Sequence, residues 1–166
     1  MAVRPVLHLP HPRLKQRSEP VGPIDDDPRA LAADLVDTMR SHPACVGLAA
    51  PQIGVALRAF VVDVTGHKKA HSCHGEIVLF DPELLAADDP VLAREGCLSV
   101  PDLTGDVARA SIVLVRGVAV TGEVRTIEAD AFEARALLHE IDHLDGVLFL
   151  DRVASHASVF RRRVYR

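Results

Sequence analysis

The chain has 166 residues, of which 48% are hydrophobic, and its formal net charge at pH 7 is -4. This length and composition suit one globular domain with a sizeable core, so residues 1–166 are expected to form a single domain. The acidic balance argues against a dedicated nucleic-acid binder, and no apolar run approaches the length of a membrane span.

The N-terminal segment and the cysteines indicate a cytoplasmic protein. Residues 1–16 are interrupted by three prolines, and no continuous apolar core precedes a small-residue cleavage site, so no signal peptide is read. The cysteines are an odd count in such a chain and are expected to be free thiols rather than a disulfide framework. They are Cys45, Cys73 and Cys97.

The first predicted helix lies within residues 25–43, DDDPRALAADLVDTMRSHP. Its apolar residues recur at helical spacing along one face. Asp27 is a candidate N-cap, and Pro28 would then occupy the first helical position, where proline is favoured. The helix should end before Pro43.

The second half of the chain predicts strands followed by a buried helix. Strands are expected at Arg58–Val64 and Glu76–Phe80, and a hairpin is expected from residues 111–129 around Thr121-Gly122. Residues 130–146 form a helical segment that is apolar on nearly every side, as in a buried helix. We therefore predict an α+β fold, with antiparallel or mixed sheets wrapped around this central helix.

The buried helix carries the pattern His139-Glu140-x-x-His143. Residues four apart lie on the same face of a helix, so both imidazoles can bind one metal ion. Glu140, beside the first histidine, can handle a proton at a metal-bound water. Because a catalytic zinc site usually has three protein ligands and a water, the pattern requires a third ligand.

No downstream residue supplies that ligand at a familiar spacing. A third histidine would be expected at position 149, which is Phe149, and no glutamate follows Glu140. Upstream, Cys97 in REGCLSVP could bind zinc or ferrous iron as a thiolate. An inert buried thiol is the alternative reading of this cysteine.

Three segments together resemble the signature motifs of peptide deformylases, in the order and at the separations of that family. They are VGLAAPQIGV (Val46–Val55), EGCLSVP (Glu95–Pro101) and HEIDHLDG (His139–Gly146). The resemblance covers nearly the whole chain. It implies an enzyme that removes the N-terminal formyl group from N-formylmethionyl nascent peptides through a metal-bound water.

The resemblance implies that Cys97, His139 and His143 hold one divalent metal ion. Ferrous iron is expected, with zinc, nickel or cobalt as alternatives. Glu140 would act as general base and then general acid. A general metallopeptidase and a catalytically impaired metal-binding relative are the alternative readings.

Further roles are implied by the same motifs. The side-chain amide of Gln52 and the backbone N–H of Leu98 would donate hydrogen bonds to the developing oxyanion. Val46 and Gly47 would lie along the substrate. Four residues would contact the metal ligands or their neighbours without binding the metal: Glu95, Arg109, Asp142 and Leu138. Leu138 stands where most relatives have glutamine.

Two regions carry weaker signals. Residues 67–75, HKKAHSCHG, contain three histidines and a cysteine, but their spacing matches no familiar metal site. The C-terminal sequence SVFRRRVYR contains four arginines. In some deformylases a basic terminal segment contacts the ribosome, so a transient ribosome contact is a second expected partnership.

Overall fold

The computed structural model describes residues 2–162. Its regular elements are α1 (Asp26–Arg40), β1 (Gly47–Ala49), β2 (Ala59–Val62), β3 (Ile77–Cys97), β4 (Val100–Val118), β5 (Val124–Asp130), α2 (Ala131–Leu144) and β6 (Val159–Arg161). All strand pairs are antiparallel, in the order β1-β2-β3-β4-β5, and β6 pairs with β4. The α+β prediction is confirmed.

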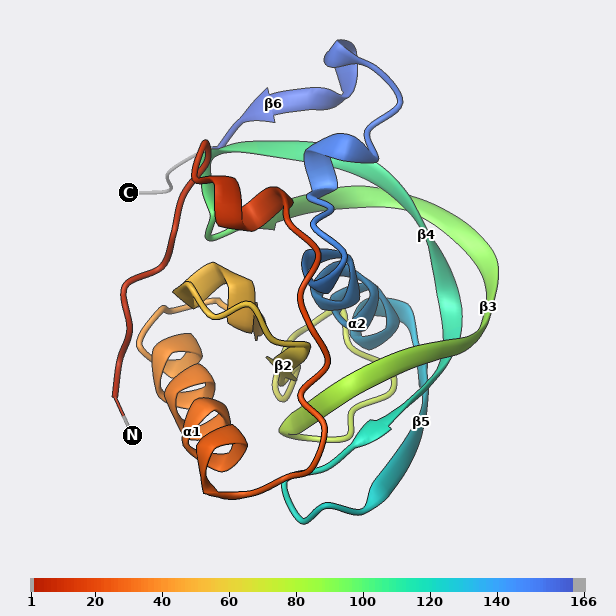
Figure 1. Ribbon diagram of the computed structural model, residues 1–166. Helices are drawn as coiled ribbons and strands as arrows, with labels where there is room; N and C mark the ends of the chain where they lie inside the picture. The colour runs from red at the N-terminus through yellow and green to blue at the C-terminus, as the bar shows by residue number, and fades with distance from the viewer. Residues whose placement is uncertain (1, 163–166) are drawn as a thin grey trace.

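Strands β1 and β2 lie between the two helices, and their alternate side chains therefore pack in two different hydrophobic clusters. Phe60 and Val62 pack in the cluster that contains the apolar face of α2. Ala59 and Val61 pack in the cluster that contains α1. Strands β3, β4 and β5 curve around the other side of α2 (Figure 1). Helix α2 is therefore buried along most of its length.

Helix α1 begins two residues before the expected position. The N-cap is Asp25, whose side chain accepts a hydrogen bond from the backbone N–H of Asp27. The assignment of Asp27 as N-cap was wrong because three consecutive aspartates offer the same capping group, and the first one is used. Pro28 consequently lies in the third helical position, and the helix ends at Arg40, before Pro43.

Strand β3 is much longer than the predicted strand Glu76–Phe80. The sequence signal stops at Asp81-Pro82, because both residues are rare in strands. Asp81 has a φ of 49°, and the register with β4 shifts between Phe80 and Glu83. Such bulges bend a strand, and here the bend allows β3 to continue around α2 as far as Cys97.

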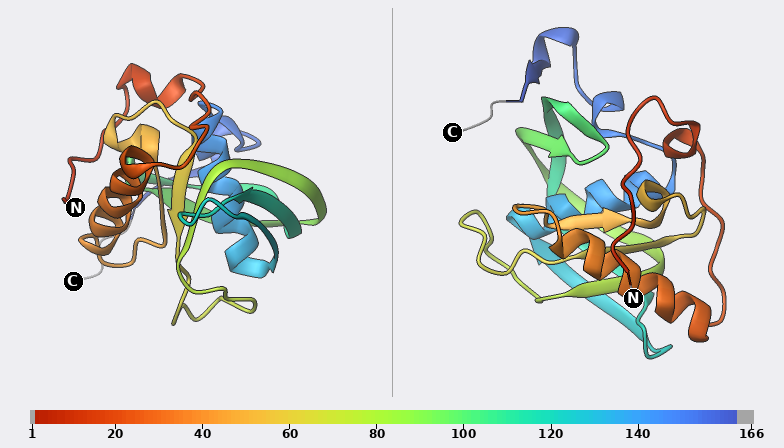
Figure 2. Two further views of the ribbon diagram at one scale, coloured as in Figure 1. Left: turned by 60° about the horizontal axis from the view of Figure 1, so that its bottom comes forward. Right: turned by 90° about the vertical axis from the view of Figure 1, so that its left-hand side faces the viewer.

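The far end of the β3–β4 hairpin carries the cysteine motif. Cys97 pairs with Val100, so Leu98 and Ser99 form a two-residue turn. Strand β6 lies against β4 at this end of the hairpin (Figure 2). Within residues 2–162, no helix is long and apolar enough to cross a lipid bilayer.

Candidate metal centre and substrate pocket

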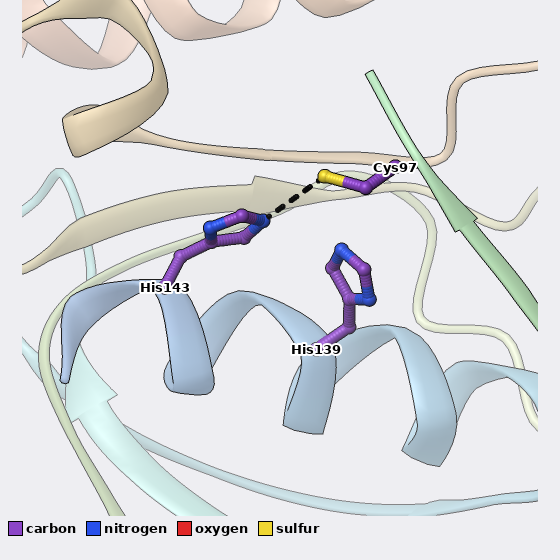
Figure 3. A group of neighbouring side chains, drawn as sticks. All are labelled: Cys97, His139 and His143. Carbon is purple, nitrogen blue, oxygen red and sulfur yellow. Dashed lines mark hydrogen bonds between the residues drawn. The ribbon is translucent and has the colours of Figure 1, made fainter. Parts of the chain in front are cut away.

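Three potential metal ligands converge between α2 and the end of β3. The Sγ atom of Cys97 and one ring nitrogen each of His139 and His143 all lie within 4.8 Å of one another. Figure 3 shows both rings rising from α2 toward the cysteine. Cys97 Sγ and His143 Nε2 are 3.3 Å apart, close to the roughly 3.5 Å expected between two donors on one tetrahedral ion. The donor set therefore fits a divalent metal ion.

The two histidines differ in the direction of their pKa shifts, and metal binding would release a proton from His139. His139 Nδ1 lies 2.8 Å from Glu95 Oε1, and since that carboxylate is ionised, Nδ1 donates and Nε2 faces the cysteine. Burial alone would lower the pKa of His139, but its hydrogen bonds to Cys97 and Glu95 raise it well above its ordinary value. Burial holds the pKa of His143 well below its ordinary value, so its ring is neutral.

Glu95 is the centre of a buried ionic network. Arg109 donates to both of its oxygens, at 2.6 and 3.0 Å, and Arg135 Nη1 donates to Oε2 at 2.7 Å. The side chains of Glu95 and Arg109 are only 6% and 3% exposed, so the pair is buried. Burial would raise the pKa of Glu95, but hydrogen bonds from His139 and Arg109 hold it well below its ordinary value.

Asp142 extends the network on the side of α2 away from the metal ligands. Its carboxylate accepts from Arg109 Nη1 at 2.8 Å and from Arg152 Nη2 at 2.7 Å. Leu138 lies on this side too, where it lines a second cavity of about 430 Å³ together with Arg109 and Asp142. The side chain of Leu138 therefore lies next to the network and does not line the pocket at Cys97 and His139.

Glu140 is buried beside the metal ligands and lies against Gly47. A Cβ atom at Gly47 would lie 2.6 Å from Glu140 Oε1, so glycine leaves the space that the carboxylate occupies. Glu140 Oε2 is buried and has no hydrogen-bond partner among the described residues. Burial raises the pKa of Glu140 to about 7, despite the nearby positive charges of His139 and Arg109. Such a carboxyl can accept and return a proton at neutral pH.

Gln52 brings a polar side chain to the cysteine from the turn after β1. Its Oε1 accepts from the backbone N–H of Ala49 at 3.0 Å, which fixes the orientation of the amide. Its Nε2 then points toward Ser99 Oγ at 3.1 Å and Cys97 Sγ at 3.5 Å. The amide N–H groups of Gln52 are thus held close to the metal centre.

A cavity of about 360 Å³ opens onto these groups. Val46 and Gly47 line one side, Leu98 lines another, and His139 and Glu140 line the wall formed by α2. This volume suits a small ligand with an apolar side chain. The structure therefore brings two of the three metal ligands, Cys97 and His139, and the residues expected to contact the substrate to one pocket.

The histidine-rich segment 67–75 forms no second centre within the described residues. His67 stacks on Phe132, with ring centroids 4.0 Å apart, and His74 Nδ1 lies 2.6 Å from Glu133 Oε1. The loop is therefore docked onto the first turn of α2.

Sequence reasoning missed three residues of the site. Ser99 is fully buried and contacts Gln52, Arg135 contacts Glu95, and Arg162 lines the pocket from the end of β6. EGCLSVP contains Ser99 and could have suggested its burial. Arg135 is a charged residue in a helix that was expected to be buried, which was the available signal for a buried charge. No pattern in the sequence linked Arg162 to the pocket.

Comparisons with known proteins identify the family. The family model for polypeptide deformylase matches residues 3–158. The peptide deformylase of Agrobacterium fabrum is 40% identical over 157 residues, covering 93% of this chain and 89% of that protein. That of Acidothermus cellulolyticus is 43% identical over 153 residues, covering 92% of this chain and 80% of that protein.

Solved structures agree with the sequence comparisons. The crystal structure of a peptide deformylase from Legionella pneumophila has a TM-score of 0.85 and 39% identity, covering 95% of this chain and 89% of that one. A crystal structure of a peptide deformylase from Ehrlichia chaffeensis in complex with actinonin has a TM-score of 0.88 and 32% identity, covering 95% of this chain and 92% of that one. The resemblance noted in the sequence is thus confirmed, and the chain belongs to the peptide deformylase family.

Proposed function

We propose that the centre formed by Cys97, His139 and His143 performs the reaction of this family, the hydrolytic removal of the N-terminal formyl group from nascent peptides. The chain is a metal-dependent hydrolase of N-formylmethionyl peptides. The observation that supports this placement of the reaction is the convergence of those three ligands beside the pocket that Gln52 and Glu140 line. Residues 1–166 would act as one catalytic domain, with α2 carrying the central motif.

The ion that these residues would hold is ferrous iron, with zinc, nickel or cobalt as alternatives. One thiolate and two imidazoles are acceptable ligands for all four metals, so the donor set supports a divalent ion without selecting one. When bound there, a divalent cation lowers the pKa of a water molecule and polarises the formyl carbonyl.

Glu140 would move the proton in this reaction. Its buried carboxylate accepts a proton from the attacking water and returns it to the nitrogen of the departing amine. Attack on the carbonyl carbon places negative charge on the formyl oxygen. The Gln52 amide and the backbone N–H of Leu98 would donate hydrogen bonds to that oxygen. Ala49 would contribute indirectly, because it fixes the rotation of the Gln52 amide.

The pocket would accept the first side chain of the substrate. Val46 and Leu98 offer apolar surface, and Gly47 leaves the peptide backbone room to approach. A peptide deformylase from Acinetobacter baumannii, 33% identical to this chain, has a solved structure with Met-Ala-Ser bound. This supports a preference for an unbranched methionine side chain at the first position.

We also propose that four residues support the metal ligands, as the family resemblance implies: Glu95, Arg109, Asp142 and Leu138. Glu95 would set the orientation of His139, and Arg109 and Asp142 would hold Glu95 in place. A cytoplasmic location and a transient ribosome contact also remain predictions. Residues 163–166 of the basic tail lie outside the described residues.

The decisive experiment is a deformylation assay on formyl-Met-Ala-Ser, using protein purified without oxygen. We expect release of formate by the wild type and none above background by Glu140→Gln, with the same metal content in both. A wild type that is loaded with iron, nickel or cobalt and releases no formate would contradict the proposed function. A glutamine variant with near-wild-type rates would contradict the role of Glu140 alone.

A further inference from the structure

Arg162 reaches the substrate pocket from the end of the last described strand. Strand β6 pairs with β4 through Gly105, Thr104 and Leu103, and the backbone N–H of Arg162 donates to Asp102 O at 2.9 Å. The side chain then turns toward the cysteine hairpin, where Nη2 lies 3.3 Å from the carbonyl oxygen of Cys97. Arg162 lines the same pocket as Glu140.

Side-chain packing fixes β6 against the hairpin. The guanidinium of Arg94, from β3, lies over the ring of Phe160, 3.8 Å from its centroid. A Cβ atom at Gly105 would lie 2.7 Å from Val153 Cγ1 and 3.3 Å from the carbonyl oxygen of Ser158, so the glycine allows the segment before β6 to approach β4. The position of Arg162 is therefore set by strand pairing and packing on both sides.

Most hydrogen-bond donors of the Arg162 guanidinium have no partner among the described residues. A Cβ atom at Gly96 would overlap Nη2, so the glycine provides the space in which the guanidinium lies. The Nε atom is buried and has no hydrogen-bond partner in the described part of the chain. Within residues 2–162, no carboxylate forms an ion pair with Arg162. Of the five N–H donors of a guanidinium, the carbonyl of Cys97 uses only one.

We propose that Arg162 is a substrate-binding residue that donates a hydrogen bond to a backbone carbonyl of the peptide beyond its first residue. The inference rests on the proposed function, since it assigns a second contact to the same substrate. A peptide whose formyl group lies beside Glu140 must leave the pocket past its other lining residues, of which Arg162 is one. A backbone carbonyl is present in every peptide, so this contact is independent of sequence.

The test compares two substrates that differ in length. Formyl-Met methylamide ends directly after the first residue, whereas formyl-Met-Ala-Ser amide extends past it, and neither carries a charge at its end. We expect Arg162→Gln to raise KM for the longer substrate about tenfold, as for the loss of one hydrogen bond from a charged donor. Its kcat, and both constants for the shorter substrate, should stay within about twofold of wild type.

Arg161→Gln is the matched control, because it removes the same charge from the neighbouring residue, which is exposed and does not line the pocket. This variant should behave as wild type on both substrates, and Arg162→Lys should recover part of the lost affinity. The Kd of the product Met-Ala-Ser amide, measured by calorimetry, should rise with KM in Arg162→Gln only.

Three outcomes would overturn the inference. An unchanged KM for the longer substrate would exclude the contact. An equal rise of KM for both substrates with a lowered Tm would show that Arg162 only supports the fold. Equal effects of Arg161→Gln would assign the change to overall charge. Absence of deformylation by the metal-loaded wild type would instead overturn the proposed function, and this inference with it.

Discussion

Gly47 and Glu140 come from β1 and α2, and the carboxylate of Glu140 fills the space beside the α-carbon of Gly47. A Cβ atom at position 47 would lie 2.6 Å from Oε1 and 3.1 Å from the carboxyl carbon. The φ angle of Gly47 is not in the left-handed region, so the backbone there tolerates an L-residue. The glycine is therefore required by this contact and not by its backbone conformation.

Gly47→Ala should displace the Glu140 carboxylate without changing the metal ligands. We expect kcat to fall by roughly tenfold to a hundredfold, because misplacing a catalytic group by about 1 Å has effects of that size. Metal content and Tm should stay close to those of the wild type. An alanine variant with wild-type kcat would show that the carboxylate position is not critical.

The pH dependence of kcat/KM should report the ionisation of Glu140. Burial raises its pKa to about 7, and a divalent cation held by the neighbouring ligands would lower this value again. Only the deprotonated carboxylate can accept a proton, so activity should be lost as pH falls through this pKa, at a pH below about 7 in the metal-loaded enzyme. Circular dichroism over the same range separates this loss from acid unfolding. A flat acid profile in folded protein would argue against a carboxylate base.

Arg109 and Arg116 lie on the same strand, β4, and provide a matched pair for testing the buried network. Arg109→Met leaves Glu95 and Asp142 with one cation fewer in a buried site, which should destabilise the fold by about 3 kcal/mol. Arg116→Met removes an exposed pair with Glu83 and should cost less than about 1 kcal/mol. Urea unfolding measures both. Similar losses in the two variants would mean that burial adds nothing to the Arg109 contacts.

Sensitivity to air should distinguish the metals. Oxygen can oxidise both ferrous iron and the thiolate of Cys97, so the iron-loaded enzyme should lose activity in air. The nickel- or cobalt-loaded enzyme should retain it, and mass spectrometry should find oxidation of Cys97 mainly in the iron-loaded sample. Equal lifetimes of the iron and nickel forms would count against iron as the working metal.

The helices and the hairpin could be predicted because their signals are local. Residues 130–146 form an apolar helical segment that ends in a glycine, and Gly146 has a positive φ of 73° just after α2. The continuation of β3 past Phe80 could not be predicted in this way. Asp81 and Pro82 disfavour strands locally, and only pairing with β4 and curvature around α2 stabilise the extended backbone there.

The ligand candidates came from short motifs, whereas their supporting contacts depend on tertiary structure. Spacing along a helix was enough to pair His139 with His143. The contact of Arg135 with Glu95 joins residues 40 positions apart in the sequence, and no local pattern specifies it. Arg162 was read as part of a basic tail, since nothing nearby indicates that β6 carries it to the pocket. Long-range pairing and burial determine both positions.

The sharing of one carboxylate by several cations also constrains how this chain can evolve. Glu95 pairs with both Arg109 and Arg135 while it orients His139, so replacing any one of these residues alone changes the electrostatic surroundings of the others in a buried site. Mutational effects at these positions should therefore show strong epistasis, and double-mutant cycles should be far from additive. The stability cost of losing Arg135 would depend on whether Glu95 and Arg109 had already been substituted. The order of substitutions would therefore decide which sequences evolution can reach without passing through an unstable protein.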